Sequence, residues 1–171
     1  MRILLGLLFC FHYQHAFALG KIEIQVDLAP TGSFVATSRS LRGHAAFIKA
    51  KLKSTKIEVD TSSFETGIAL RNEHFRHRLQ YEKYPVASLD EIKLHGDFKT
   101  GNGSGLLFVR GHTEKIQFSY QIEDQIIRAS FLVSAKKFGI KNVAYMGVGV
   151  RDKMKVVAYI PLVNLKLKNQ F

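Results

Sequence analysis

A cluster of ionisable side chains between residues 70 and 79 has the clearest capacity for chemistry in this sequence. Glu73 and His77 stand one helical turn apart, and His74 lies between them. Three arginines are interleaved with these residues: Arg71, Arg76 and Arg78. A zinc site needs three or four ligands, the H-E-x-x-H pattern is absent, and neighbouring guanidinium groups repel a cation. The sequence therefore predicts no metal site here.

Arg71 and His74 have two interpretations that the residues alone leave open. In the first, His74 is a buried histidine that ties a helix to the rest of the fold. Arg71 is then a buried guanidinium paired with a carboxylate such as Glu65 or Glu73. In the second, Arg71 and His74 are anchors for the head group of a ligand at the mouth of a barrel. No G-x-S-x-G elbow or phosphate-binding loop accompanies them, so no catalytic residue is predicted. A small enzyme that acts on lipid-like substrates through this pair is an alternative.

The elements that must position this cluster are strands and one short helix. The stretch from Leu70 to Leu79 shows no alternation and no Gly or Pro, which predicts a helix that ends before Tyr84-Pro85. Elsewhere polar and apolar residues alternate, which is typical of half-buried strands: 21–27, 56–60, 116–122, 129–135 and 154–160. Turn signals separate these segments: 30–32, 101–105, 123–125 and 151–153. We expect an all-β, antiparallel barrel of about eight strands with one short helix.

A barrel of this size has an interior that either is filled by side chains or holds one small ligand. Alternation places the following residues on the inward face: Phe34, Ala36, Ile57, Val59, Ala87, Leu89, Leu107, Val109, Phe118, Tyr120, Phe131 and Val133. Ala36 and Ala87 are small and leave room. The pattern alone does not separate a packed core from a lined pocket. Gly101, Gly103 and Gly105 are expected in a hairpin loop.

Length and composition favour one globular domain preceded by an export signal. The chain has 171 residues, 46% hydrophobic and 23% charged, which is typical of a folded protein. Residues 1–18 combine Arg2, a short apolar run and the cleavage pattern Ala16-Phe17-Ala18, which predicts a secretory signal peptide. The only cysteine, Cys10, lies inside it, so residues 19–171 are expected to form a domain without a disulfide.

The net charge of +11 favours an acidic partner. Lys49, Lys51 and Lys53 alternate and would project from one face of a single strand. We expect this face to meet an anionic membrane surface. A basic barrel that binds single-stranded nucleic acid is an alternative, but an export signal argues against that partner. The lysines could also be a solvated strand edge.

Five segments, in order along the chain, resemble the YceI-like family. Residues 57–67 resemble its strand and turn, and Arg71-Asn72-Glu73-His74-Phe75 is similar to its Arg-Asp-x-His-Leu. Residues 81–87 are similar to its Lys-Tyr-Pro segment, and 107–111 with Ile116 look like its Leu-x-Ile-x-Gly hairpin. Lys137-Phe138-Gly139-Ile140 looks like its Asp-Phe-Gly-Ile.

The resemblance implies a lipocalin-like barrel that holds a long apolar ligand, a polyisoprenoid or an isoprenoid quinone, in its lumen. It implies a periplasmic or secreted protein that binds lipid without catalysis and without a cofactor. Ligand contacts are then expected from the inward residues Phe34, Ala36, Ala87, Leu89, Leu107, Val109, Phe118, Tyr120, Phe131 and Val133. Ala135 and Lys137 replace the family's Arg and Asp before Phe-Gly-Ile, and the family's His before Ser33 is missing. These differences concern the head-group contacts more than the fold.

Overall fold

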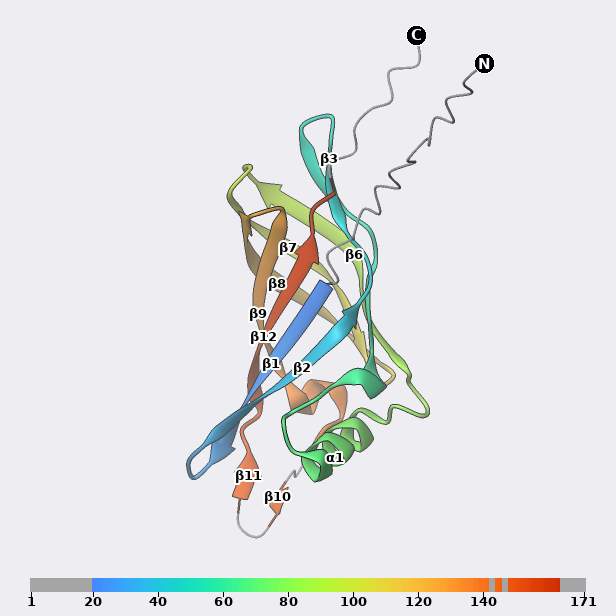
Figure 1. Ribbon diagram of the computed structural model, residues 1–171, viewed down its shortest axis with the longest axis vertical. Helices are drawn as coiled ribbons and strands as arrows, with labels where there is room; N and C mark the ends of the chain where they lie inside the picture. Colours follow the sequence, from blue (N-terminus) through green and yellow to red (C-terminus); the bar gives the residue numbers. More distant parts are fainter. Residues whose placement is uncertain (1–19, 142–143, 146–147, 164–171) are drawn as a thin grey trace, which may run out of the picture.

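Alternating apolar and polar residues form the strands of a barrel in the computed structural model, which describes residues 20–141, 144–145 and 148–163 (Figure 1). The strands are β1 (Gly20–Ala29), β2 (Ser33–Leu41), β3 (Ala45–Ile48), β4 (Lys51–Ser54), β5 (Ile57–Asp60), β6 (Val86–Gly96), β7 (Thr100–Val109), β8 (His112–Glu123), β9 (Ile126–Ser134), β10 (Ala144–Tyr145), β11 (Val148–Val150) and β12 (Lys153–Pro161). The helices are η1 (Thr61–Ser63), α1 (Ala69–Leu79) and η2 (Ala135–Phe138).

Eight of these strands form the barrel wall, in the order β2-β1-β12-β9-β8-β7-β6-β5. Every neighbouring pair in this order is antiparallel. The predicted eight-stranded antiparallel barrel is therefore confirmed. The short strands β10 and β11 extend the sheet beyond β1, and β3 pairs with β4 as a separate hairpin.

Two isolated bridges close the barrel between the segment that contains β2 and the segment that runs from β5 past η1. The backbone N–H of Arg42 donates to the carbonyl of Glu58 at 2.8 Å, and the N–H of Glu58 donates back at 3.0 Å. Further along, Thr37 and Glu65 exchange the same pair of bonds at 2.7 and 2.9 Å. The strands separate between these two bridges, so side chains must complete the closure there.

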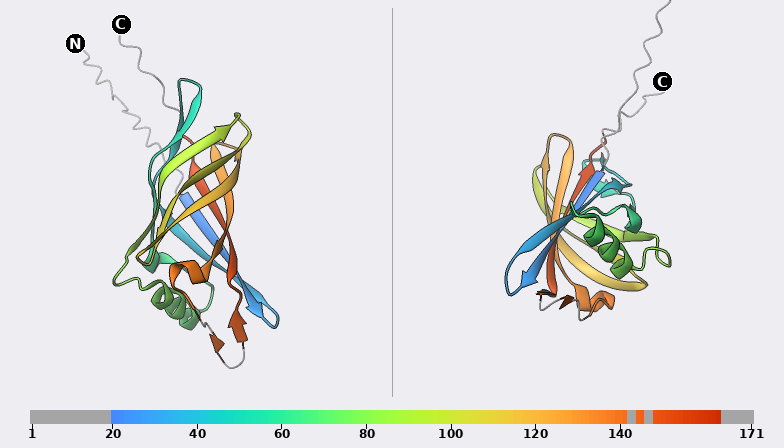
Figure 2. Two further views of the ribbon diagram at one scale, coloured as in Figure 1. Left: turned by 180° about the vertical axis from the view of Figure 1, so that it is seen from behind. Right: turned by 60° about the horizontal axis from the view of Figure 1, so that its bottom comes forward.

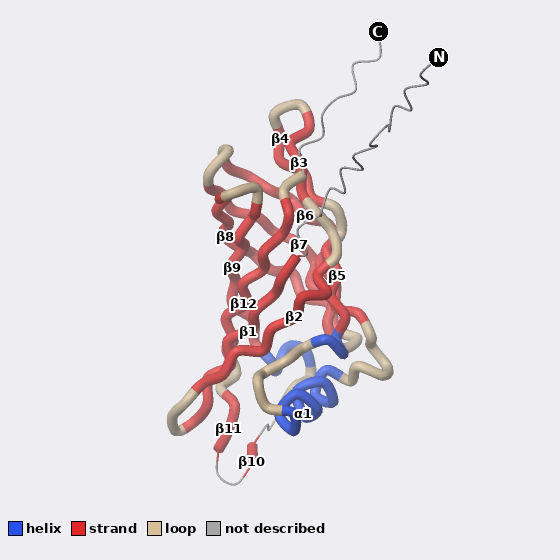
Figure 3. Tube along the Cα trace, in the orientation of Figure 1, coloured by secondary structure: helices blue, strands red, loops and turns tan. Residues whose placement is uncertain are grey.

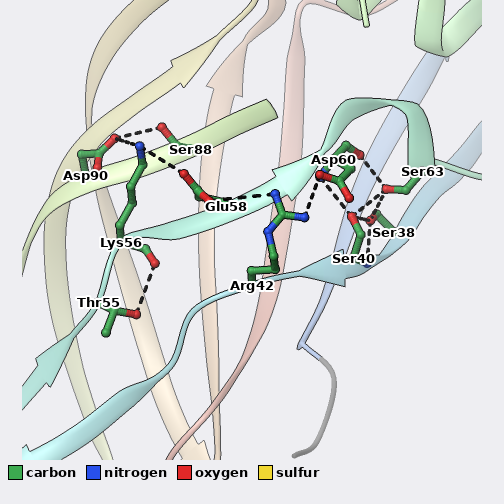
Figure 4. A network of polar contacts seen from close by, with 10 residues as sticks. All are labelled: Ser38, Ser40, Arg42, Thr55, Lys56, Glu58, Asp60, Ser63, Ser88 and Asp90. Atoms are coloured by element: carbon green, nitrogen blue, oxygen red, sulfur yellow. Dashed lines mark hydrogen bonds and ion pairs between the residues drawn. The ribbon is translucent and has the colours of Figure 1, made fainter. Parts of the chain in front are cut away.

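Serine hydroxyls fill the gap between β2 and β5 (Figure 4). The Ser63 Oγ lies 2.7 Å from the Ser38 Oγ and 2.8 Å from the Ser40 Oγ. The Ser40 Oγ also accepts the backbone N–H of Asp60 at 3.0 Å. The guanidinium of Arg42 bonds to the Asp60 carboxylate at 2.8 Å on the exposed side. We call this set the β2–β5 seam, and it satisfies backbone groups that a continuous ladder would otherwise pair.

The helices gather at one end of the barrel, and the β3–β4 hairpin stands at the other (Figures 1 and 3). The view turned toward the helical end shows α1 lying across it (Figure 2). The predicted helix is confirmed, but its end has a different cause from the one expected. Gln80 adopts the left-handed conformation, and its N–H bonds to the carbonyls of Arg76 and His77, so α1 stops before Tyr84-Pro85.

Two sequence interpretations of local structure were wrong. Gly101, Gly103 and Gly105 lie within strand β7 and not in a hairpin loop. Their role is steric, because a Cβ at Gly101 or Gly103 would collide with the ring of Tyr120 or Phe118 on the neighbouring strand. Lys49 is also misplaced, because it lies in the turn between β3 and β4. Only Lys51 and Lys53 share a strand face.

The predicted signal peptide, residues 1–18, lies outside the described residues and stays a prediction. Among the helices in the described ranges, none combines the length and apolar character that crossing a membrane demands.

Candidate ligand cavity

A cavity of about 780 Å³ occupies the interior of the barrel. Apolar side chains from the strands form its wall, because each strand turns alternate residues toward the lumen. This volume lies within the range of roughly 300–1,000 Å³ that is common for small-molecule sites. The structure therefore favours a lined pocket over a fully packed interior, a choice that the sequence pattern left open.

Eight of the ten residues predicted to contact a ligand line this cavity: Phe34, Ala87, Leu89, Leu107, Val109, Phe118, Phe131 and Val133. Ile57 and Val59, which were also predicted to face inward, line it as well. They come from β2, β5, β6, β7, β8 and β9, so alternation assigned the inward face correctly across these six strands.

Ala36 and Tyr120 do not line the cavity, and their predicted place in the lumen was wrong. Both are buried in protein contacts instead. Ala36 is completely buried, in a cluster with Val59 and Phe64. Tyr120 is 2% exposed, and its ring packs against Gly101 on β7. Burial raises the pKa of the Tyr120 phenol, and the nearby negative charge of Asp97 adds to the rise.

Strands β1 and β12 supply cavity residues that sequence reasoning missed. They are Ile22, Ile24, Val26 and Leu28 on β1, and Met154, Val156, Ala158 and Ile160 on β12. The signal was present, because both strands alternate in the sequence. Phe138, the last residue of η2, and Ile140, which follows Gly139, also line the cavity. No strand alternation exists in this segment from which their inward position could be predicted.

A pair of small residues widens the lumen in the middle of the β9–β12 wall. Ala129 and Ala158 are cross-strand partners, and both line the cavity. They are 4% and 6% exposed, so any larger side chain here would extend into the cavity. Their neighbours along β9 are the larger Ile127 and Phe131.

The α1 end of the cavity has a polar and basic rim. Four side chains of α1 line it: Arg71, His74, His77 and Arg78. Phe75 and Leu79 of the same helix face the apolar interior, where they pack in the cluster around Phe64. Helix α1 therefore presents an apolar face to the lumen and basic groups at its mouth. His77 is held near Glu73, with its Nε2 3.8 Å from the carboxylate.

Arg71 makes backbone and aromatic contacts in place of the predicted carboxylate pair. Its Nε donates to the Thr66 hydroxyl at 3.0 Å, and its Nη2 donates to the Thr66 carbonyl at 2.6 Å. Its guanidinium carbon lies 4.5 Å from the centre of the Phe34 ring. The expected pairing with Glu65 or Glu73 was wrong, because the guanidinium is turned toward Thr66 and the cavity wall. Arg71 thus fixes the 64–68 loop and also borders the lumen.

His74 was predicted to be buried if its role were structural, and this was wrong. Its side chain is exposed at the rim of the cavity. The second interpretation, an anchor for a polar head group, stays a prediction, and His74 has the exposed position at the cavity rim that it requires. Within the described ranges, no three His, Cys, Asp or Glu side chains form a group that could hold a metal.

The fold and the cavity define a class of protein, an antiparallel eight-stranded barrel built around an internal apolar pocket. The sequence model of the YceI-like domain matches residues 12–162, and the chain belongs to this family. No curated protein sequence matches the chain at a significant level.

Several solved structures share the fold. BcnA from Burkholderia cenocepacia superposes with a TM-score of 0.69 at 15% identity, covering 84% of this chain and 96% of that one. A polyisoprenoid-binding domain from Saccharophagus degradans, implicated in plant cell wall breakdown, gives 0.58 at 16% identity, covering 85% and 96%. The YCEI protein of Campylobacter jejuni gives 0.51 at 14% identity, covering 70% and 80%. At these identities the similarity concerns the fold.

Proposed function

We propose that the protein is a carrier that holds a long apolar lipid of the isoprenoid or isoprenoid-quinone class in the barrel lumen, without catalysis and without a cofactor. The observation that carries this proposal is the apolar cavity of about 780 Å³ with a basic rim at α1. An apolar chain in the lumen would gain roughly 25 cal/mol for each Å² removed from water. The polyisoprenoid-binding domain of the same fold supports the ligand class.

The rim suggests how such a ligand would be oriented. Apolar strands surround the lumen, while His74, His77 and Arg78 stand at the α1 mouth. A polar or acidic head group would remain at this mouth, where it can be solvated and can meet these donors. The hydrocarbon would extend toward the opposite end of the barrel.

The proposal is tested by the lipid that accompanies the protein. Full-length protein is expressed in its own host, purified, and examined by native mass spectrometry and by analysis of its organic extract. Ala129→Phe adds bulk to the lumen wall, and Leu132→Phe on the outer face of the same strand is its control, because Leu132 is 66% exposed. We expect an isoprenoid lipid at about one per chain in the parent and the control, and a folded but empty A129F.

Two results would overturn the proposal. One is a parent protein that carries no lipid and does not bind isoprenoid quinone after delipidation. The other is conversion of the added lipid to a product, abolished by His74→Ala, which would favour the enzymatic alternative. Recovery of chemically unchanged lipid supports a carrier.

The carrier is proposed to work in the periplasm or outside the cell. This part of the proposal rests on the sequence of residues 1–18 and not on the described structure. N-terminal sequencing of the exported protein should give a chain that begins near Leu19. An exported chain that retains Met1 would contradict it.

A further inference from the structure

The end of the barrel opposite α1 exposes two large apolar side chains, one aromatic and one aliphatic. Phe98, in the β6–β7 turn, is 62% exposed, and Ile48, at the end of β3, is 47% exposed. The Phe47 ring lies 4.7 Å from the Phe98 ring, centroid to centroid, so the hairpin and the turn are in contact. Ile48 is the next residue on β3, so its side chain lies on the other face of the hairpin, with that of its partner Lys51. We call this surface, residues 47–53 and 97–99, the hairpin tip. Large exposed apolar groups that gather in one place indicate a contact surface.

Lysines surround this apolar group. Lys49, Lys51, Lys53 and Lys99 all belong to the hairpin tip and are exposed. One acidic residue, Asp97, accompanies them. Its carboxylate accepts the backbone N–H groups of Lys99 and Thr100, both at 2.7 Å, which lower its pKa and use its charge within the turn. The tip is therefore strongly cationic and carries the exposed side chains of Phe98 and Ile48 among its lysines.

The turn that presents the tip is built at a conformational cost. Lys49 and Ala50 form the two-residue loop between the paired residues Ile48 and Lys51, and both have positive φ, 50° and 60°. Such loops normally use Asn-Gly or other residues that tolerate this conformation. Lysine and alanine at these two positive-φ positions lower the stability of the hairpin. The loop nevertheless places Lys49 at the extremity of the hairpin.

The tip also stands at one end of the lipid cavity. Ala45, at the base of β3, lines the cavity together with Leu41 and Ile160. We propose that the hairpin tip docks on an anionic bilayer, with Phe98 and Ile48 inserted at the boundary between head groups and acyl chains and the lysines on the head groups. Exposed apolar side chains accompanied by lysines are the combination by which interfacial segments bind anionic lipid. Docking would bring the cavity end without α1 to the membrane.

Vesicle binding tests this proposal independently of what fills the lumen. The mature protein, residues 19–171, is mixed with phosphatidylglycerol–phosphatidylethanolamine vesicles or with pure phosphatidylcholine vesicles, and binding is measured by vesicle flotation. We expect binding to the anionic vesicles alone, weakened strongly between low and physiological salt. The triple variant Lys49→Glu, Lys51→Glu and Lys53→Glu should bind the anionic vesicles on the order of a hundredfold more weakly. Each lysine near an anionic surface adds to the free energy of binding, and each glutamate is repelled by it.

Matched variants separate insertion from general charge attraction. A double variant, Ile48→Ser with Phe98→Ser, removes both exposed apolar side chains of the hairpin tip and leaves every lysine in place. The control is a double variant on the outer wall, away from the tip. Leu132→Ser removes one apolar side chain, and Lys155→Glu reverses the charge of its cross-strand partner. We expect weak vesicle binding from the first pair and parental binding from the second, with both retaining the parental thermal melt.

A fluorescence reporter tests insertion directly, without relying on the loss of vesicle binding in these variants. The chain has no tryptophan, so Phe98→Trp places a single indole at the tip, and Leu132→Trp places one on the barrel wall. With anionic vesicles, the F98W emission should move to shorter wavelength and be quenched by brominated acyl chains, while that of L132W should not change. An F98W emission that ignores vesicles, or equal losses in the tip and wall variants, would overturn the proposal. So would binding to single-stranded oligonucleotides in place of vesicles.

Because the lumen variant A129F keeps its tip, its vesicle binding should equal the parent's even if the barrel carries no lipid.

Discussion

The ring of Phe118 on β8 packs directly over Gly103, its cross-strand partner on β7. Phe118 lines the cavity, and a side chain at position 103 would occupy the space of its ring. The glycine therefore determines how far the Phe118 ring lies from the centre of the lumen. Aromatic rings that cover cross-strand glycines are a known means of stabilising curved sheets.

Gly103→Ala should destabilise the barrel by about 1–3 kcal/mol, because the new methyl group overlaps the ring and forces a rotamer change. The displaced ring has space only on the lumen side, so the cavity should shrink and lipid capacity should fall. Thermal and chemical denaturation measure the first effect, and native mass spectrometry measures the second. Ser104→Ala, the next residue on β7, should change neither. A fully stable, fully loaded G103A would contradict this account.

Ser63→Ala should weaken the β2–β5 seam by about 1–2 kcal/mol, because it leaves the part-buried hydroxyls of Ser38 and Ser40 short of a partner. Faster hydrogen exchange should appear at the amides of β5 before the rest of the barrel. The neighbouring Ser62 is exposed, so Ser62→Ala is the matched control and should exchange like the parent. Unchanged exchange in β5 would show that the two backbone bridges close the barrel unaided.

Arg71 and His74 should separate into a structural and a binding role. Arg71→Lys should lower stability by about 1–2 kcal/mol, because an ammonium cannot reproduce the two bonds to Thr66 and the contact with Phe34. His74→Ala should leave the thermal melt unchanged, since the side chain is exposed, but should weaken binding of a lipid with an acidic head group. His95→Ala, an exposed histidine on β6, is the control. Equal lipid affinity in H74A and the parent would remove His74 as an anchor.

Asp152 should make stability depend on pH in the acid range. Its carboxylate accepts the backbone N–H of Lys136 and the Ser134 hydroxyl, and these bonds hold the pKa of Asp152 below its usual 3.8. A lowered pKa stabilises the fold at neutral pH, and this contribution disappears as pH falls below about 3.8 and through the folded-state value. Asp152→Asn should reduce stability at pH 7 and flatten the acid limb of the stability profile. Asp124→Asn, in an exposed turn, should match the parent at pH 7.

Much of the barrel could be predicted because local alternation and burial agree in an antiparallel sheet with one face inward. The inward assignment of Phe131 and Val133 follows from this, as does the lining role that β1 and β12 share. Ala36 and Tyr120 do not line the cavity as alternation predicted, because a side chain that points inward can still be covered by other side chains. Ala36 is enclosed by Val59 and Phe64, and the Tyr120 ring packs against Gly101.

The polar site was less predictable, because its geometry depends on residues distant in sequence. The sequence left open whether Arg71 and His74 tie the helix to the fold or stand at the mouth of the barrel, and local sequence determined that they lie on a helix. Their partners depend on the tertiary structure, which turns Arg71 to Thr66 and Phe34 and leaves His74 exposed.

Sequence alone determined the fold class, the helix between β5 and β6, and the surplus of lysine, because each follows from local pattern or composition. The tertiary structure decided that the interior is a cavity, since its volume depends on how small pairs such as Ala129 and Ala158 meet across strands. It also brought Phe47 and Phe98, about 50 positions apart in the sequence, to the same end of the barrel. Alternation specifies which face a residue occupies, whereas contacts between distant segments depend on how the whole sheet closes.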